Sequence, residues 1–262
     1  MPTAGAETGE AVAGEAATWE VVGPPDAPPI VFVHGALMGR SVWRPQIDAL
    51  ADRYRCISVD LPGHGTQRER AFEVDDAIAG VVRAIDEAAD GRTVLVGLSL
   101  GGYVAMALAG RHPERVRGLV IAGATREPTG ANHLAFLLYA GMLRLAPESA
   151  VRAVALAWFR RRYGPVLGAA ITAGGHFARG GSQAVRRIAG RPFRDRLLAY
   201  GGPILVINGT LDLVFRIGAG RFLAGVPGVT HRVIPRAGHL SNVDRPEVFT
   251  GLIEEFIGSL AA

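Results

Sequence analysis

A serine between two glycines stands at the centre of the most informative stretch of this 262-residue sequence. The stretch Gly97-Leu98-Ser99-Leu100-Gly101 ends the apolar run TVLVG and opens the helix-forming run YVAMALAG. In such a strand–turn–helix setting the glycines permit a sharp turn that exposes the serine hydroxyl at a helix N-terminus. The pattern therefore predicts that Ser99 is a nucleophile and not merely a helix cap.

A serine hydroxyl needs a base within hydrogen-bond reach to attack a carbonyl at neutral pH. Among seven histidines, His239 is the best placed, because it follows the last strand-like run on a loop before the final helical segment. Asp212 follows the run PILVIN and is the predicted acid that orients the imidazole. The chain order Ser99, Asp212, His239 is the order expected when the nucleophile sits on a strand-to-helix turn.

Other residues compete for these roles. His34 and His64 also follow strand-like runs, but both are next to glycines in turns, so we interpret them as structural or substrate-lining residues. Asp60 is the strongest rival to Asp212 as the acid. It precedes the serine and lies in a Pro/Gly turn, and both facts favour Asp212.

Acyl transfer at a carbonyl also needs two N–H donors aimed at the developing oxyanion. The backbone amides of Leu100 and Ala36 are the predicted donors, with Leu37 as an additional one. Aromatic and apolar residues from several segments are candidates for the pocket lining, namely His34, Leu37, Leu98, Tyr139, Met142, Trp158 and Phe215. Two alternatives stay open. The apolar residues of the helical segments could pack on the sheet, as such residues more often do, and not line a pocket. Arg160–Arg162 could be a solvated face or could attract an anionic group of the substrate.

Short apolar runs alternate along the chain with segments of helical period. Several of the runs are continuously apolar, as expected for parallel strands covered on both faces. A helical stripe over residues 74–85 and a final helix, expected to start at Asp244 with Pro246 in its first turn, illustrate the helical segments. The predicted strands are Thr18–Val22, Ile30–His34, Tyr54–Asp60, Thr93–Leu98, Val116–Gly123, Ile204–Asn208 and Val229–Ile234. This alternation predicts an α/β fold with a doubly wound, mostly parallel sheet.

The alternation breaks once, over about eighty residues between Gly123 and Ile204 that carry no strand signal. A plain connection is much shorter than this. We therefore expect residues 125–197 to form a helical cap, or lid, on a core domain made of residues 18–124 and 198–262. Residues 1–17 are rich in Ala, Gly and Glu and are expected to form a flexible tail.

Five motifs occur in order along the chain: IVFVHG (30–35), DLPGHG (60–65), GLSLGG (97–102), NGTLD (208–212) and AGHL (237–240). With these motifs the sequence resembles the α/β-hydrolase superfamily, in its branch of capped serine esterases and lactonases. The resemblance implies a sheet of about eight strands with the helical cap inserted after the sixth. A serine at the nucleophile position argues against the epoxide-hydrolase and dehalogenase branches, which use an aspartate there.

Together these features predict a hydrolase that cleaves an ester, lactone or thioester of a small to medium hydrophobic substrate through an acyl-enzyme on Ser99. An acyltransferase, a C–C bond hydrolase or a cofactor-free perhydrolase would use the same three residues. A non-catalytic ligand-binding member of the fold would not need all three. No metal or organic cofactor is expected, since no suitable cluster of ligands is apparent.

Composition excludes several other classes. The net charge is +4 and the pI about 9.8, because every basic residue is an arginine. These arginines are spread along the chain without a nucleic-acid-binding motif, so no nucleic-acid partner is expected. The sequence has no long apolar stretch free of charges, so no membrane span is predicted. The single cysteine, Cys56, is expected to be buried and fits a reducing, cytoplasmic location, while the oligomeric state stays open.

Overall fold

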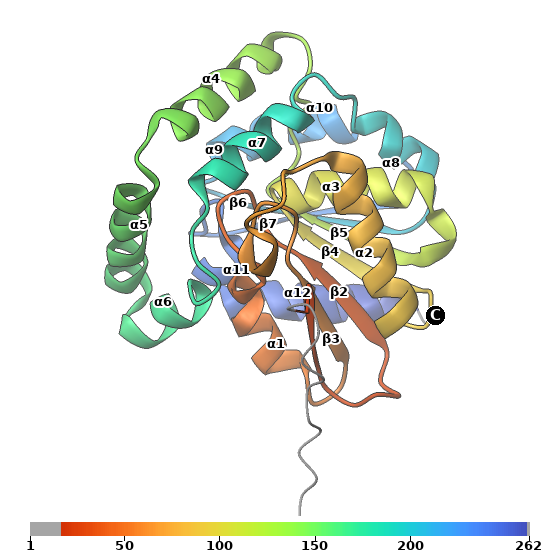
Figure 1. Cartoon of the computed structure of the whole chain (residues 1–262). Helices are drawn as coiled ribbons and strands as arrows, with labels where there is room; N and C mark the ends of the chain where they lie inside the picture. The colour runs from red at the N-terminus through yellow and green to blue at the C-terminus, as the bar shows by residue number, and fades with distance from the viewer. Residues whose placement is uncertain (1–16, 261–262) are drawn as a thin grey trace, which may run out of the picture.

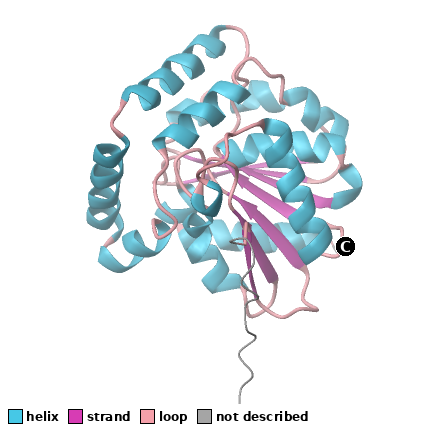
Figure 2. Ribbon diagram, viewed as in Figure 1, coloured by secondary structure: helices cyan, strands magenta, loops and turns pink. Residues whose placement is uncertain are grey.

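The structure is a computed structural model that describes residues 17–260. The predicted flexible tail, residues 1–17, therefore lies outside the described residues except for its last position. A sheet of seven strands runs through the centre, in the order β1-β3-β2-β4-β5-β6-β7, with only β1 antiparallel to its neighbour (Figures 1 and 2). The strands are β1 (Trp19–Val22), β2 (Pro29–Val33), β3 (Arg55–Val59), β4 (Thr93–Leu98), β5 (Val116–Ala122), β6 (Ile204–Gly209) and β7 (Val229–Ile234).

All seven predicted strands are present, with ends that agree to within one residue. The apolar runs marked them reliably because β2, β4 and β6 are buried along almost their whole length. The predicted count of about eight strands was too high for the described residues. The helical insertion accordingly follows the fifth described strand, not the sixth.

Helices cover both faces of the sheet (Figure 2). Helices α1 and α12 pack on one face, and α2, α3, α8 and α10 on the other. The helices of the core are α1 (Arg44–Leu50), α2 (Val74–Ala88), α3 (Leu100–Arg111), α8 (Arg194–Tyr200), α9 (Leu213–Arg216), α10 (Ala219–Leu223), α11 (Ser241–Asp244) and α12 (Pro246–Ser259), with short 3₁₀ turns η1 (Arg40–Trp43), η2 (Gly65–Gln67) and η3 (Pro113–Arg115).

Alternate residues of each strand divide between two apolar cores. On β2, for example, Val31 and Val33 join the core beneath α2 and α3, while Ile30 and Phe32 join the core beneath α1 and α12. This alternation follows from the period of two in a strand. Cys56 on β3 is fully buried, as predicted, and burial raises the pKa of its thiol to about 12.

Between β5 and β6 the chain forms α4 (Ala131–Leu145), α5 (Glu148–Tyr163), α6 (Pro165–Ile171) and α7 (Ala178–Ile188). Figure 1 shows α4, α5 and α6 as a row along the outer edge of the molecule, with α7 between them and the sheet. Residue 197, the predicted end of the cap, falls inside α8, where Leu197 is buried in the core next to α3. The division into two domains stays a prediction.

Within the described residues no single helix is long and apolar enough to cross a membrane. Only α4 and α5 taken together have the length and apolar composition of a membrane span, and the chain bends by 102° between them.

The last helix starts later than predicted. Helix α12 begins at Pro246, and Asp244 instead ends the short helix α11. The reason is that the Asp244 carboxylate does not cap the helix but accepts hydrogen bonds from Gly238 and from Tyr163.

Candidate active site

Ser99 occupies the sharp turn between β4 and α3. Its backbone has φ 53° and ψ −114°, a conformation that non-glycine residues rarely adopt. The turn requires glycine at positions 97 and 101. A side chain on Gly97 would collide with the Gly101 carbonyl, and one on Gly101 would collide with the carbonyl of Val33. The Ser99 N–H donates to the Ala122 carbonyl oxygen at 2.7 Å, which ties the strained turn to β5.

His239 and Asp212 meet at the ends of neighbouring strands. The Nδ1 atom of His239, on the loop after β7, lies 2.9 Å from Oδ2 of Asp212, on the loop after β6. Asp212 is buried, and its second oxygen accepts a 3.4 Å hydrogen bond from the Phe215 amide at the start of α9. The carboxylate thereby fixes the Nδ1–H tautomer of the ring and leaves Nε2 free to act as a base.

Two neighbours hold the His239 ring in place. Phe215 stacks on it with ring centroids 4.9 Å apart. Gly123, at φ 59°, leaves room for the ring, since a Cβ there would lie 2.9 Å from Cε1. A glycine is therefore needed at this position both for the backbone and for the imidazole.

Ser99, Asp212 and His239 all line one cavity of about 540 Å³. Among the described residues no hydrogen bond joins the Ser99 hydroxyl to His239 in this structure. Such contacts are often long in unliganded sites and shorten when substrate binds. The structure thus brings the three predicted residues to one cavity and orients the His239 imidazole by the Asp212 carboxylate.

The predicted oxyanion donors line the same cavity as Ser99. The Leu100 amide opens α3, where the first N–H groups have no helical acceptor. In the loop after β2, no acceptor for the amides of Ala36 and Leu37 lies within the described part of the chain. The carbonyl of Ala36 lies 2.7 Å from Nε2 of His64, and that of Leu37 accepts from Phe177 at 3.0 Å. These contacts fix the loop while leaving its N–H groups available.

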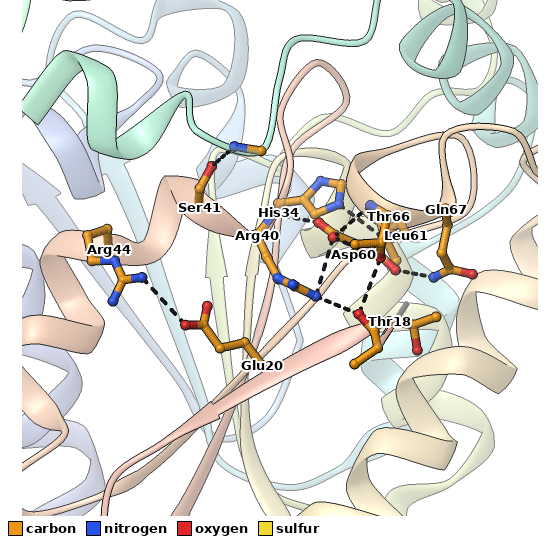
Figure 3. A network of polar contacts seen from close by, with 12 residues as sticks. Thr18, Glu20, His34, Arg40, Ser41, Arg44, Asp60, Leu61, Thr66 and Gln67 are labelled. Carbon is orange, nitrogen blue, oxygen red and sulfur yellow. Dashed lines mark hydrogen bonds and ion pairs between the residues drawn. The ribbon is translucent and has the colours of Figure 1, made fainter. Parts of the chain in front are cut away.

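Asp60, the rival acid, lies in a separate polar network behind this loop (Figure 3). It is buried, accepts from the amides of Arg40 at 2.8 Å and Thr66 at 3.0 Å, and pairs with the Arg40 guanidinium at 3.5 Å. The carboxylate is therefore occupied in holding the two loops together. Asp60 makes no hydrogen bond with His239 among the described contacts.

His34 belongs to the same network (Figure 3). Its Nδ1–H donates to the Gly35 carbonyl at 2.8 Å and its Nε2 accepts from the Leu61 amide at 3.0 Å. Both nitrogens are thus used by a neutral ring, and complete burial lowers the pKa of His34 to about 4. His34 is structural and does not line the cavity.

The predicted pocket residues divide into two groups. Leu37, Leu98, Tyr139 and Phe215 line the cavity. Besides His34, the residues Met142 and Trp158 lie outside its lining and are exposed, because the sides of α4 and α5 that carry them face outward. Further residues complete the lining, among them Tyr103, Arg126, Phe136, Phe159, His176 and Ile188.

His176 reaches the cavity because the chain before α7 runs beside the loop after β2, where Met38 and His176 form an isolated bridge. Only the tertiary fold makes this contact, so no local signal could identify it. Across the residues that the structure describes, no cluster of three His, Cys, Asp or Glu side chains could hold a metal ion.

The sequence and the fold of this chain are similar to those of known proteins. The family model for the alpha/beta hydrolase fold matches residues 28–246. A pimeloyl-[acyl-carrier protein] methyl ester esterase of Nitrosomonas europaea is 28% identical over 87% of this chain and 95% of its own length. A 3-oxoadipate enol-lactonase of Acinetobacter baylyi is 25% identical over 94% of this chain and 95% of its own length. A thermophilic esterase structure from Thermogutta terrifontis matches with a TM-score of 0.74 at 26% identity over 93% of both chains.

The chain belongs to the alpha/beta hydrolase family and is a hydrolase.

Proposed function

We propose that the enzyme cleaves an ester, lactone or thioester of a small to medium hydrophobic substrate through an acyl-enzyme on Ser99. The observation that carries the proposal is the 2.9 Å contact of His239 with buried Asp212 in the cavity that also holds Ser99. An oriented imidazole in the same cavity as a partly exposed serine can activate the serine hydroxyl.

In the first half of the reaction, Nε2 of His239 accepts the Ser99 proton as the serine oxygen attacks the substrate carbonyl. The amides of Leu100 and Ala36, with Leu37 as the additional donor, stabilise the tetrahedral oxyanion. His239 then gives its proton to the leaving alcohol or thiol, and the acyl-enzyme forms. In the second half His239 takes a proton from water as the water oxygen attacks the acyl carbonyl. The bond between the acyl group and the Ser99 oxygen then breaks, the acid leaves, and His239 returns the proton to the Ser99 oxygen.

The cavity wall supports a hydrophobic substrate. Apart from the triad, its lining is mostly aliphatic and aromatic, with Phe136 and Tyr139 from α4 and Phe159 from α5 closing the side opposite the sheet. We propose that residues 125–197 act as the cap over this cavity. An apolar acyl or alkyl group gains about 25 cal/mol for each Å² that it buries against such a wall.

Labelling with a fluorophosphonate probe tests the nucleophile. The wild-type enzyme should become labelled and lose esterase activity, whereas Ser99→Ala should take up no label. Ser182→Ala is the matched control, because Ser182 is buried on α7 away from the cavity lining and donates to the Ala140 carbonyl. Equal labelling of wild type and Ser99→Ala contradicts the assignment.

A panel of neutral 4-nitrophenyl esters of increasing chain length tests the substrate class. We expect kcat/KM to rise from acetate to medium chains and to fall once the chain outgrows the cavity. A preference for acetate would contradict a hydrophobic acyl pocket. Adding a competing alcohol, amine or hydrogen peroxide and analysing the products separates hydrolysis from acyl transfer and perhydrolysis, which share the acyl-enzyme.

A further inference from the structure

Charge is strongly segregated along this chain. Residues 125–197 contain twelve arginines and only three carboxylates, Glu127, Glu148 and Asp195. The rest of the chain contains sixteen arginines and twenty-one carboxylates. The modest net charge of the whole protein therefore hides a strongly basic insertion on a mildly acidic core. Such asymmetry is typical of a surface that meets a polyanion.

Helix α4, in this basic insertion, is apolar on all sides. Of its fifteen residues only Asn132, His133 and Arg144 are polar. One side packs on α7, where Ala140 and Leu143 are buried. The opposite side exposes Leu134, Leu138, Met142 and Leu145, by 62%, 66%, 59% and 85%. We call these four residues the α4 stripe. A helix that is apolar all round is normally covered on all sides, so the stripe lacks a partner within the described chain.

The α4 stripe adjoins the substrate cavity. Tyr139 lies next to Leu138 in the sequence, lines the cavity and is itself partly exposed. Across the cavity α9 contributes Val214 to the lining and exposes Leu213 beside it. An apolar rim therefore borders the cavity from two sides.

Arginines lie on α4 and α5, the two helices that follow the outer edge of the molecule in Figure 1. Arg144 lies on α4, and Arg152, Arg160 and Arg161 lie on α5. All four are exposed, and none forms an ion pair or side-chain hydrogen bond with another described residue. Their charges are thus available to an external anion.

We propose that the α4 stripe and these four arginines dock the enzyme on an anionic lipid surface, with the cavity rim at the interface. Leucines enter the boundary between headgroups and acyl chains, while the arginines bind lipid phosphates. A second copy of the chain fits less well, since a two-fold contact through this face brings arginines against arginines. A nucleic acid would use the arginines but leave the leucines in water.

Sedimentation with lipid vesicles tests the proposal. The full-length enzyme should bind vesicles of phosphatidylcholine mixed with phosphatidylglycerol, bind pure phosphatidylcholine more weakly, and lose affinity as salt rises. Leu138→Ser with Leu145→Ser should weaken binding about ten-fold or more for each leucine. Arg144→Gln with Arg161→Gln should weaken it about five-fold for each arginine.

Matched controls lie on the core. Val233→Ser with Val248→Ser removes two exposed apolar residues there, and Arg92→Gln with Arg221→Gln removes two exposed arginines. Both control pairs should bind vesicles like wild type. All variants should keep their melting temperature and their hydrolysis of a soluble short-chain ester, since none of these residues lines the cavity.

Any of three results overturns the proposal. The first is that the enzyme does not bind anionic vesicles, and the second is that the control pairs weaken vesicle binding as much as the test pairs. The third is a dimer in sedimentation analysis that Leu138→Ser dissociates, with no vesicle binding. Binding is measured without turnover, and Ser99→Ala should bind like wild type. The docking proposal and the proposed function can therefore fail independently.

Discussion

The Asp244 carboxylate accepts a 2.7 Å hydrogen bond from the Gly238 amide, one residue before His239. Its other oxygen accepts from the Tyr163 hydroxyl and the Arg162 guanidinium at the end of α5, each at 3.0 Å. The side chain is almost fully buried. One carboxylate thus connects the loop of the proposed base to the helices above the cavity.

We expect Asp244→Ala to lower both activity and stability. It leaves the Gly238 amide without its acceptor and frees the loop that carries His239, so kcat should fall about ten-fold and the free energy of unfolding by about 2–4 kcal/mol. Asp244→Asn keeps an acceptor for Gly238 and should retain most of kcat. Tyr163→Phe removes one hydrogen bond between α5 and Asp244 and leaves that of Arg162, so it should affect kcat least. Normal kinetics in Asp244→Ala would contradict a role in positioning the loop.

Asp212→Asn should reduce kcat by a factor on the order of 10⁴, because an amide cannot stabilise the imidazolium or fix the Nδ1–H tautomer. The amide oxygen can still accept from Phe215, so α9 and the melting temperature should be retained. Steady-state kinetics on a short-chain ester, with a thermal melt, check this. The corresponding Asp60→Asn variant should lose stability much more than kcat, and a larger kcat loss there than in Asp212→Asn would reverse the two assignments.

His64→Ala should lower kcat about ten-fold with little change in KM, because the ring contacts the Ala36 carbonyl at the edge of the oxyanion loop. Removing an oxyanion donor outright costs 10²–10³ in kcat, which sets the upper limit for losing its support. His64→Gln can donate to the same carbonyl and should recover part of the loss. A variant that melts earlier but turns over normally would show that the ring only stabilises the fold.

Acidification should destabilise the fold through His34. Burial lowers its pKa to about 4, whereas an unfolded chain has a histidine pKa near 6.5. Between these values the unfolded state binds the extra proton, so the free energy of unfolding falls as pH drops below about 6.5, by about 2 kcal/mol at pH 5. Urea unfolding at pH 7 and pH 5 measures this. In His34→Asn the free energy of unfolding should depend less on pH. The same pH dependence as in wild type would contradict this role of His34.

The parts of the fold that follow from local sequence were predictable. Continuous apolar runs marked each strand, and the glycine spacing around Ser99 marked the turn that the backbone adopts. Their positions after strand-like runs, together with the chain order, indicated His239 and Asp212, which the structure places in contact.

The rest depends on tertiary packing. An apolar-all-round helix has no periodicity to show which side turns inward, so Met142 was assigned to the pocket although it faces outward. On α5 the apolar residues are mixed with charged ones and form no clear stripe, and Trp158, predicted to line the pocket, is exposed. Asp244 and His176 act through partners about eighty and one hundred and forty residues away, Tyr163 and Met38, and no local pattern encodes such contacts.

The buried thiol of Cys56 makes this protein well suited to site-specific spectroscopy. The sequence has one cysteine, which is inaccessible and, with its raised pKa, stays protonated and unreactive at neutral pH. A single new cysteine on the surface would therefore carry a maleimide fluorophore or a nitroxide without replacement of Cys56. A probe at Leu145→Cys would report directly on the polarity around the outer side of α4.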